Sequence, residues 1–460
     1  MKLVIDTLAN ALAAAPPGEQ YVVALSGGVD SVVLLHAMVQ LRDQARIEPR
    51  LSAIHINHGL QEQADDWQSF CQSLCETWQV PLQLQKVKVP PGASLENAAR
   101  ESRYQAFAEL LPPQALLLLA HHLDDQLETL LLRLLRGAGP AGLQGMPRQR
   151  EVGDGMLFRP LLDISRDQII DYGQRNRLQW VEDESNQQLH HDRNYLRQQV
   201  FPLLEARWPG YRDSWAKSLT LLGEAGQMLR EIAEQDLKAV ASEQGRLRVS
   251  RLRTLSAARQ RQLIRFWMQQ LGLAEPGWNQ LQQLVQEVLE QEEGSGKLQL
   301  EGCCLQVYSD ELYALKKLPD IESNGFEKIE IEMQARLLPG NGYLDFQQQQ
   351  GLGLSAQCDQ LELRYRQGGE SIALTGRPGK SLKKLFQEYA IPPWLRDRIP
   401  LLFHQGELVC VPGLGIAESA LAAQGEPGYA VCWQPPESEF NLRGLQSHSA
   451  LRAPNNDIAD

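Results

Sequence analysis

Short apolar runs alternate with amphipathic segments over the first part of the chain. The apolar runs have the length of strands and cover residues 21–25, 51–57 and 116–120. Each is followed by a segment with helical spacing of apolar residues, over 31–39, 65–78 and 124–135. This alternation predicts βα units on a parallel sheet. Because the runs contain few polar residues, we expect strands covered on both faces, within an α/β domain spanning 1–215.

After Phe201-Pro202 the pattern becomes helical up to about Glu293. Apolar residues recur on one helix face in the set Leu263, Ile264, Trp267, Met268 and Leu271, and again in the set Leu281, Leu284, Val285 and Val288. Alternating residues from Leu298 to Val307, followed by the turn-like Ser309-Asp310, predict a hairpin. The pattern therefore indicates a mainly helical domain over 216–320.

The remaining sequence divides into three stretches. Residues 321–354 contain Asn341-Gly342 and a glutamine run at 347–350, which are typical of a linker. Residues 355–433 predict a small mixed α+β domain. The polar stretch 434–460 is rich in turn formers, and we expect it to be disordered.

Composition places the chain among soluble globular proteins. It has 460 residues, of which 43% are apolar and 22% charged, so two or three domains are expected. No apolar run reaches the roughly 18 residues of a membrane span, and Asp6 and Asn10 interrupt the apolar N-terminal stretch where a signal peptide would need continuity. We expect a cytoplasmic protein without membrane association.

The seven cysteines include no Cys-x-x-Cys pair. Structural zinc and iron–sulfur sites usually draw ligands from close thiol pairs. We therefore expect free thiols and no structural metal.

Charge is unevenly distributed. The formal net charge of −12 argues against a uniformly basic surface that coats nucleic acid. Residues 246–265 nevertheless contain seven arginines and no acid, 133–150 contain four arginines and no acid, and 364–400 contain eight basic residues against three acids. These stretches could hold a polyanion along a track, although solvated helix faces would look the same.

The segment between the first predicted strand and its helix is Ser26-Gly27-Gly28-Val29-Asp30-Ser31. Its glycines permit a tight turn that brings backbone N–H groups against an anion, and a helix N-terminus favours phosphate there. We expect all six residues to bind ATP. The loop lacks the Gly-Lys-Ser/Thr ending used for γ-phosphoryl transfer, so another cleavage is plausible. A plain βα turn with a serine cap is the alternative.

Polar residues also follow the other two predicted strands. His55 and Asn57 end the second strand, where a nucleoside would lie, although polar strand ends are common. After the third strand, Asp125 and Glu128 are spaced i, i+3 and could hold Mg²⁺ or take a proton from an amine, but acidic first turns are also ordinary capping. Arg193 and Arg197 could contact phosphates or a substrate carboxylate.

The motifs form an ordered series. It comprises the loop from Ser26, His-x-Asn-His-Gly-Leu from His55, Ala-Arg-x-x-Arg-Tyr from Ala99, His-x-x-Asp-Asp-Gln-x-Glu-Thr from His121, Arg-Pro-Leu-Leu from Arg159, Asp-x-Ser-Asn from Asp183, and Arg-Asn-x-x-Arg from Arg193. The loop resembles that of PP-loop ATP pyrophosphatases, and the whole series resembles the tRNA(Ile)-lysidine synthases. Segments 364–369, 380–386 and 391–396 resemble the C-terminal module of that family.

This resemblance implies the reaction and its partners. Lysine would be ligated to C2 of the wobble cytidine in isoleucine tRNA with a CAU anticodon, through an adenylated cytidine, giving lysidine, AMP and pyrophosphate. ATP, Mg²⁺, free L-lysine and the tRNA are the implied substrates and partners, and a homodimer is left open. A tRNA thiolase on the same loop and a non-catalytic tRNA-binding protein are the alternatives.

Residue roles follow from the same resemblance. Asp30 would place Mg²⁺ and pyrophosphate, while Asp125 and Glu128 would serve the metal or the lysine amine, with Asp125 as a second metal ligand. Arg193 and Arg197 would contact nucleotide or substrate. The tRNA would be held by basic residues, for which the candidates are Arg133, Arg136, Arg259, Arg261, Lys380, Lys383, Lys384 and Arg396.

Overall fold

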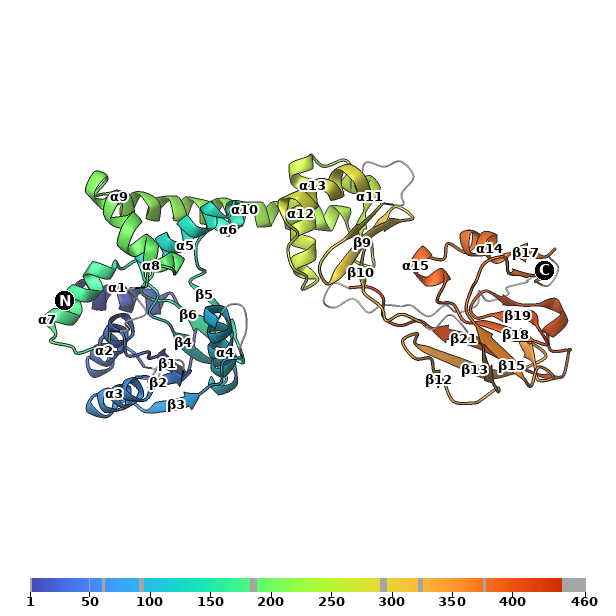
Figure 1. The fold of residues 1–460 in the computed structure, drawn as a ribbon, viewed down its shortest axis with the longest axis horizontal. Coiled ribbons are helices and arrows are strands. Elements are labelled where there is room, and N and C mark those ends of the chain that lie inside the picture. Colours follow the sequence, from blue (N-terminus) through green and yellow to red (C-terminus); the bar gives the residue numbers. More distant parts are fainter. Residues whose placement is uncertain are drawn as a thin grey trace. The chain divides into compact units, whose positions relative to one another are not determined.

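A computed structural model of the chain describes residues 2–48, 50–59, 63–90, 95–182, 188–289, 296–321, 326–374 and 378–440. They form two compact units, Met1–Met228 and Leu229–Asp460 (Figure 1).

The first unit contains a six-stranded sheet in the order β3-β2-β1-β4-β6-β5. Its strands are β1 (Gln20–Ala24), β2 (Arg50–Asn57), β3 (Leu82–Lys86), β4 (Ala115–Leu118), β5 (Gln149–Val152) and β6 (Gly155–Phe158). All neighbouring pairs are parallel except β5 with β6. The predicted parallel α/β fold is confirmed.

Helices connect and cover these strands. They are α1 (Lys2–Ala13), α2 (Val29–Asp43), α3 (Ala64–Thr77), α4 (Leu95–Leu110), α5 (Leu123–Leu135), α6 (Pro140–Leu143), α7 (Arg166–Arg175), α8 (Asp192–Tyr195), the π-helical turn η2 (Leu196–Val200), α9 (Phe201–Arg207) and α10 (Tyr211–Val240). The long helix α10 runs through the boundary expected at residue 215.

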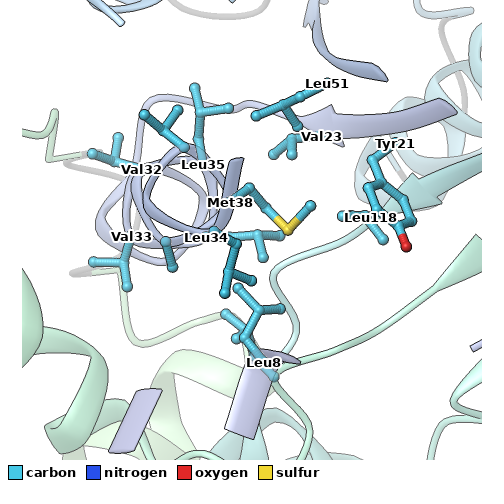
Figure 2. Close-up of a cluster of buried hydrophobic side chains, with 14 of the residues drawn as sticks. Leu8, Tyr21, Val23, Val32, Val33, Leu34, Leu35, Met38, Leu51 and Leu118 are labelled. Atoms are coloured by element: carbon cyan, nitrogen blue, oxygen red, sulfur yellow. The ribbon is translucent and has the colours of Figure 1, made fainter. Parts of the chain in front are cut away.

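The core explains why α2 is apolar around most of its circumference. Figure 2 shows Val32, Leu34, Leu35 and Met38 of α2 packed with side chains of the sheet and with Leu8 of α1. Because α2 lies between the sheet and helices α1 and α7, it has almost no solvent face. The opposite face of the sheet is covered by Phe107 of α4 and by Leu111, which directly follows this helix.

Strand order determines where a ligand can bind. The chain runs outward from β1 through β2 to β3 and then crosses back to β4 on the other side of β1, so the strand order reverses at β1, which is a topological switch point. The carboxyl ends of β1, β2 and β4 therefore meet at one edge of the sheet. All three sequence motifs that follow strands lie at this edge.

The second unit begins with the predicted helical region and its hairpin. Helices α11 (Val249–Leu252), α12 (Ala257–Gln270), α13 (Trp278–Gln283) and the π turn η3 (Leu284–Leu289) pack on the sheet β7-β10-β9-β8. Its strands are β7 (Leu247–Arg248), β8 (Lys297–Gln299), β9 (Cys303–Tyr308) and β10 (Glu311–Lys316). Ser309 and Asp310 turn the β9–β10 hairpin with φ of 46° and 64°. We call residues 240–316 the middle module.

The C-terminal module, residues 327–434, is built mainly from two antiparallel sheets, β11-β15-β18-β19-β20 and β12-β13-β21-β14. Their strands are β11 (Glu327–Ile329), β12 (Arg336–Leu337), β13 (Tyr343–Gln350), β14 (Leu354–Ser355), β15 (Leu361–Arg364), β18 (Leu401–His404), β19 (Glu407–Val411), β20 (Gly415–Ile416) and β21 (Pro427–Gln434). A small hairpin, β16 (Ser371–Ile372) with β17 (Lys380–Ser381), the helices α14 (Leu382–Glu388) and α15 (Pro393–Arg396), and the 3-10 turn η4 (Glu418–Ala420) complete it.

The stretch 321–354 differs from the expected linker, because it contributes strands β11 to β13 and the start of β14. Strand β13 pairs with β21 along its whole length. Leu344 and Phe346 point into the core, whereas the glutamine run at 347–350 is exposed. The glutamine run that suggested a linker is therefore the exposed end of a strand.

The stretch 434–460 also differs in its first part. Ser438 and Phe440 bond to β10, where the Lys316 N–H donates to Ser438 O at 2.9 Å and the Phe440 N–H donates to Ala314 O at 2.9 Å. Residues 441–460, where disorder was expected, lie outside the described residues. Within the described part of the chain, no helix has the length and apolarity needed to cross a membrane.

Replacing Phe346 by alanine tests whether β13 belongs to the C-terminal core. Loss of this buried ring should destabilise the module by about 3–5 kcal/mol. Hydrogen–deuterium exchange of peptides from 361–433 measures the effect as faster exchange. Tyr343→Ala, on the same strand but with the ring 47% exposed, is the matched control and should change exchange little. Equal exchange in both variants would contradict the assignment.

Candidate active site

A pocket of about 990 Å³ opens at the carboxyl edge of the parallel sheet. Its lining combines the loop after β1, the ends of β2 and β4, and side chains of α4, α7 and η2. The predicted site residues among its lining are Ser26, Gly28, Val29, Asp30, Ser31, His55, Asn57, Asp125 and Arg197. Residues from four separate sequence motifs therefore share one cavity.

The loop 26–31 closes on itself through its serines. The Ser26 N–H donates to Ser31 Oγ at 3.1 Å, and Ser31 Oγ–H donates to Gly28 O at 3.0 Å. Gly27 has φ of +91°, and its carbonyl accepts from the Val181 N–H at 3.0 Å. A Cβ at position 27 would lie 2.9 Å from Val181 Cγ2. The backbone turn thus requires glycine, and it leaves the start of α2 facing the pocket as an anion site.

His55 and Asn57 are buried where β2 ends, and both already have protein partners. His55 Nδ1 lies 2.8 Å from Leu25 O. The Asn57 amide donates to Asp65 Oδ1 at 2.9 Å, and its Oδ1 accepts from the Gly59 N–H at 2.9 Å. Asn57 therefore fixes the chain after β2, while both residues also line the pocket.

Asp30 and Asp125 approach the same imidazole. His122 is almost fully buried, and its Nε2 lies 3.7 Å from Asp30 Oδ1 and 3.6 Å from Asp125 Oδ2. Asp30 Oδ1 is buried and has no hydrogen-bond partner in the described part of the chain. Burial raises the pKa of Asp30, against the opposing effect of His122. An unpartnered buried carboxylate oxygen beside a phosphate loop is suited to a cation.

Arg197 joins Asp125 to Glu128. Its Nη2 donates to Asp125 Oδ1 at 2.8 Å and to Glu128 Oε2 at 3.0 Å, and its Nε donates to Glu128 Oε1. Arg193 is more distant, with Nη1 4.0 Å from Glu128 Oε2. The Glu128 side chain is completely buried behind Arg197, and it is absent from the pocket lining. The structure therefore brings four of the five expected catalytic side chains into contact with at least one other, and Asp30 faces them across His122.

The environment shifts the pKa values of Asp125 and Glu128 in opposite directions. Burial alone would raise the pKa of Asp125, but His122 and Arg197 outweigh it and lower the pKa. Burial raises the pKa of Glu128, and the bidentate contact with Arg197 opposes this and favours the ionised pair. Asp125 is thus a buried anion that lines the pocket, whereas Glu128 lies outside the pocket lining and contacts Arg197 with both carboxylate oxygens.

Several residues that support the site were given no role in the sequence analysis. Arg159 Nε donates to His121 Nδ1 at 3.2 Å, and burial lowers the pKa of His121 to about 4, so this imidazole is neutral. Asp124 accepts from the Arg166 N–H at 2.8 Å and from Arg212 Nε at 2.9 Å. The His-His-x-Asp-Asp spacing marks this helix start as polar and buried. Nothing near Arg212 in the sequence indicates its contact with Asp124, because the two residues lie 88 positions apart.

Several residues expected to hold tRNA are engaged within the protein. Arg133 donates to the carbonyls of Gly142 and Gly145 at 2.6 and 2.7 Å, Arg259 pairs with the buried Asp236, and Arg396 donates to Ile391 O at 2.8 Å. Lys380 pairs with Glu388 at 2.8 Å and Arg136 with Asp192 at 3.7 Å. Lys383 and Lys384 are exposed on α14, and Arg261 lies over the Trp278 ring. Their role in tRNA binding stays a prediction.

Family models match three parts of the chain. The PP-loop domain matches residues 2–204, the TilS substrate binding domain residues 247–313, and the TilS substrate C-terminal domain residues 361–433. The chain is 40% identical over 435 residues to the tRNA(Ile)-lysidine synthase of Pseudomonas fluorescens (strain Pf0-1), covering 92% of this chain and 94% of the relative. It is 38% identical over 417 residues to that of Serratia proteamaculans (strain 568), covering 90% and 95%.

The chain belongs to the tRNA(Ile)-lysidine synthase family. The family resemblance of its motifs is thereby confirmed, as is its use of an ATP-binding PP-loop. Among solved structures, a U34-tRNA thiolase from Methanococcus maripaludis is 18% identical with a TM-score of 0.40, covering 48% of this chain and 79% of that chain. Two parts of the lysidine synthase motif series lie outside the described residues. They are Leu60, at the end of the His55 motif, and the motif Asp183–Asn186.

Gly27→Ala should weaken ATP binding about 5- to 30-fold, because a left-handed alanine costs about 1–2 kcal/mol and its Cβ would meet Val181. Isothermal titration with ATP and Mg²⁺ measures the change. Gly28→Ala is the matched control, since Gly28 has φ of −73° and its added Cβ would lie 3.7 Å from Ser26 Oγ, an ordinary van der Waals distance. If the two variants bound ATP equally, the loop geometry would not govern binding.

Proposed function

We propose that this protein ligates lysine to C2 of the wobble cytidine of isoleucine tRNA with a CAU anticodon, using ATP. One observation carries the mechanism. A phosphate loop, an unpartnered buried Asp30 oxygen and the Asp125–Arg197 pair face one pocket. Such a pocket can hold a nucleotide at one side and a cationic amine at the other. The family relationship supports the substrates.

Asp30 is the residue suited to hold Mg²⁺ together with the phosphates. Its Oδ1 is buried without a hydrogen-bond partner among the described residues, whereas both Asp125 oxygens already accept hydrogen bonds. Bound Mg²⁺ would neutralise charge on the leaving pyrophosphate. Asp125 is thus the weaker candidate for a metal ligand.

In the adenylation step, the cytidine C2 oxygen attacks the α-phosphorus and pyrophosphate departs from the loop 26–31. The backbone N–H groups at the start of α2 hold the departing phosphates. Arg197 lies in the pocket, and its guanidinium is placed to stabilise charge on the α-phosphate. The product carries AMP on C2, which is a far better leaving group than the original oxygen.

In the transfer step, the lysine ε-ammonium group loses a proton to water, the free amine adds at C2, and the bond from C2 to the AMP oxygen breaks as AMP leaves. Asp125 has a lowered pKa, so it is better suited to bind the ammonium group as a counter-ion than to remove its proton. Glu128 cannot reach the pocket directly, because it is buried behind Arg197. We assign it to positioning Arg197.

The thiolase alternative requires reactive thiols. Cys71 and Cys75 on α3 are buried, and burial raises the pKa of Cys71 to about 12 and that of Cys75 to about 11. Thiols in that state are poor nucleophiles. A non-catalytic tRNA-binding protein would not need the intact phosphate loop and its facing carboxylates.

Glu128→Gln separates a positioning role from that of a base. A glutamine keeps the shape but weakens the hold on Arg197, so adenylation and lysine transfer should both slow by about 10-fold or more. Pyrophosphate release measures the first step, and single-turnover lysine transfer to pre-adenylated tRNA measures the second. Slowing of transfer alone would instead identify Glu128 as the base for the amine. Asp125→Asn, compared in parallel, should raise the KM for lysine.

Labelled lysine tests the whole reaction. Incubation with ATP, Mg²⁺ and a CAU-anticodon isoleucine tRNA should label the tRNA and release AMP. The methionine tRNA with the same anticodon should stay unlabelled. Active, folded protein that labels neither tRNA would remove the lysidine proposal, and pyrophosphate release without labelling would point to another nucleophile.

A further inference from the structure

The middle module presents an exposed tryptophan on a fixed base. Trp278 is the first residue of α13, and its side chain is 56% exposed. Leu281 and Leu284, further along the same segment, are fully buried against Leu263 and Ile264 of α12. Helices α12 and α13 belong to the same module in Figure 1. The ring therefore faces solvent from a backbone that the core holds in place.

An arginine supports this ring from α12. The guanidinium carbon of Arg261 lies 5.0 Å from the Trp278 ring centroid, within the range of a cation–π contact. Arg261 Nη1 also donates to Gln282 Oε1 at 3.4 Å, which ties the guanidinium to the next turn of α13. The contact on one side restrains the indole while more than half of its surface stays open.

The surrounding charge favours an anionic partner. Arg261 and Arg265 lie one turn apart on α12, within a stretch that contains seven arginines and no acid. Two of the seven are neutralised internally, Arg246 by Glu311 and Glu439, and Arg259 by Asp236. Near Trp278 the acid in the preceding loop is Glu275. Cations beside an open aromatic ring form the combination that binds unpaired bases of RNA.

We propose that Trp278, supported by Arg261, is a stacking platform for an unpaired nucleobase of the substrate tRNA; this rests on the proposed function. Every base has a π face, so such a platform contributes affinity without reading sequence. Because α13 is already ordered by its buried leucines, binding the base requires little further ordering of the protein. The platform lies in the unit that does not contain the ATP pocket, and it acts on tRNA affinity alone.

Replacement of Trp278 tests the platform in the full chain. Trp278→Ala should raise the Kd for the isoleucine tRNA by about 5- to 100-fold, the range expected for one stacked base. Trp278→Phe should restore most of the affinity, whereas Trp278→Leu, apolar but without a π face, should not. The Kd for ATP and the melting temperature should be unchanged in all three.

Salt dependence distinguishes stacking from phosphate contact. The slope of log Kd against log salt counts neutralised phosphates, so Trp278→Ala should leave the slope unchanged while shifting the whole line. Arg261→Gln combined with Trp278→Ala should weaken binding less than the sum of the separate effects, since the arginine acts partly through the ring.

The outcomes are distinguishable. If wild-type protein binds and modifies the tRNA and Trp278→Ala does so with equal affinity, the platform is wrong and the proposed function stands. If the wild-type protein neither binds nor modifies the tRNA, the proposed function is wrong, and the platform, which depends on it, is wrong as well. Equal rescue by leucine and phenylalanine, or a change of oligomeric state in place of tRNA affinity, would assign the ring to apolar packing against protein.

Discussion

The geometry of the pocket edge in the first unit depends on how one buried carboxylate is paired. Glu128 has no solvent exposure, and an ionised group in that position is stable only with a partner that satisfies its oxygens. Arg197 fills this role with two nitrogen atoms and at the same time contacts Asp125. These hydrogen bonds fix the start of α5 and the π turn η2 relative to each other. They thereby fix the position of Asp125 and Arg197 in the pocket lining.

This arrangement also explains why the backbone at η2 is unusual. The π turn runs from Leu196 to Val200, directly before Pro202 in α9. Proline has no N–H to donate, and π turns often occur where a side chain must be directed at a functional site. Arg197, near the beginning of that turn, points to the carboxylates of α5.

Local patterns predicted the first unit well. The three strands at the binding edge and their helices were expected within a few residues, because a nearly continuous apolar run of strand length, such as 51–57, is a local signal. The loop 26–31 was equally predictable from the sequence, since a glycine turn between a strand and a helix is a local property. The i, i+3 spacing of Asp125 and Glu128 correctly indicated a shared helix face.

Contacts between residues that are distant in sequence cannot be predicted from local patterns. Nothing in the spacing reveals that Glu128 turns toward Arg197, 69 residues away, and Asp125 toward the pocket. Arg259 is attached to Asp236, which sits in another helix, so a stretch that looked free of acids is partly neutralised by distant ones. Strand β13 was missed for a related reason, because its partner β21 lies near the end of the described chain.

The return of residues 438–440 to β10 changes the topology of the second unit. The chain leaves the middle module after Lys316, forms the C-terminal sheets, and comes back to pair beside β10, where Glu439 meets Arg246. Two separate stretches of backbone therefore join these modules. A single tether permits free rotation of one module about another, whereas a double tether restricts twisting and leaves bending as the easier motion. A protease cut between Lys316 and β11 would therefore leave the two modules held together only by the non-covalent pairing of residues 438–440 with β10 and by the Glu439–Arg246 ion pair.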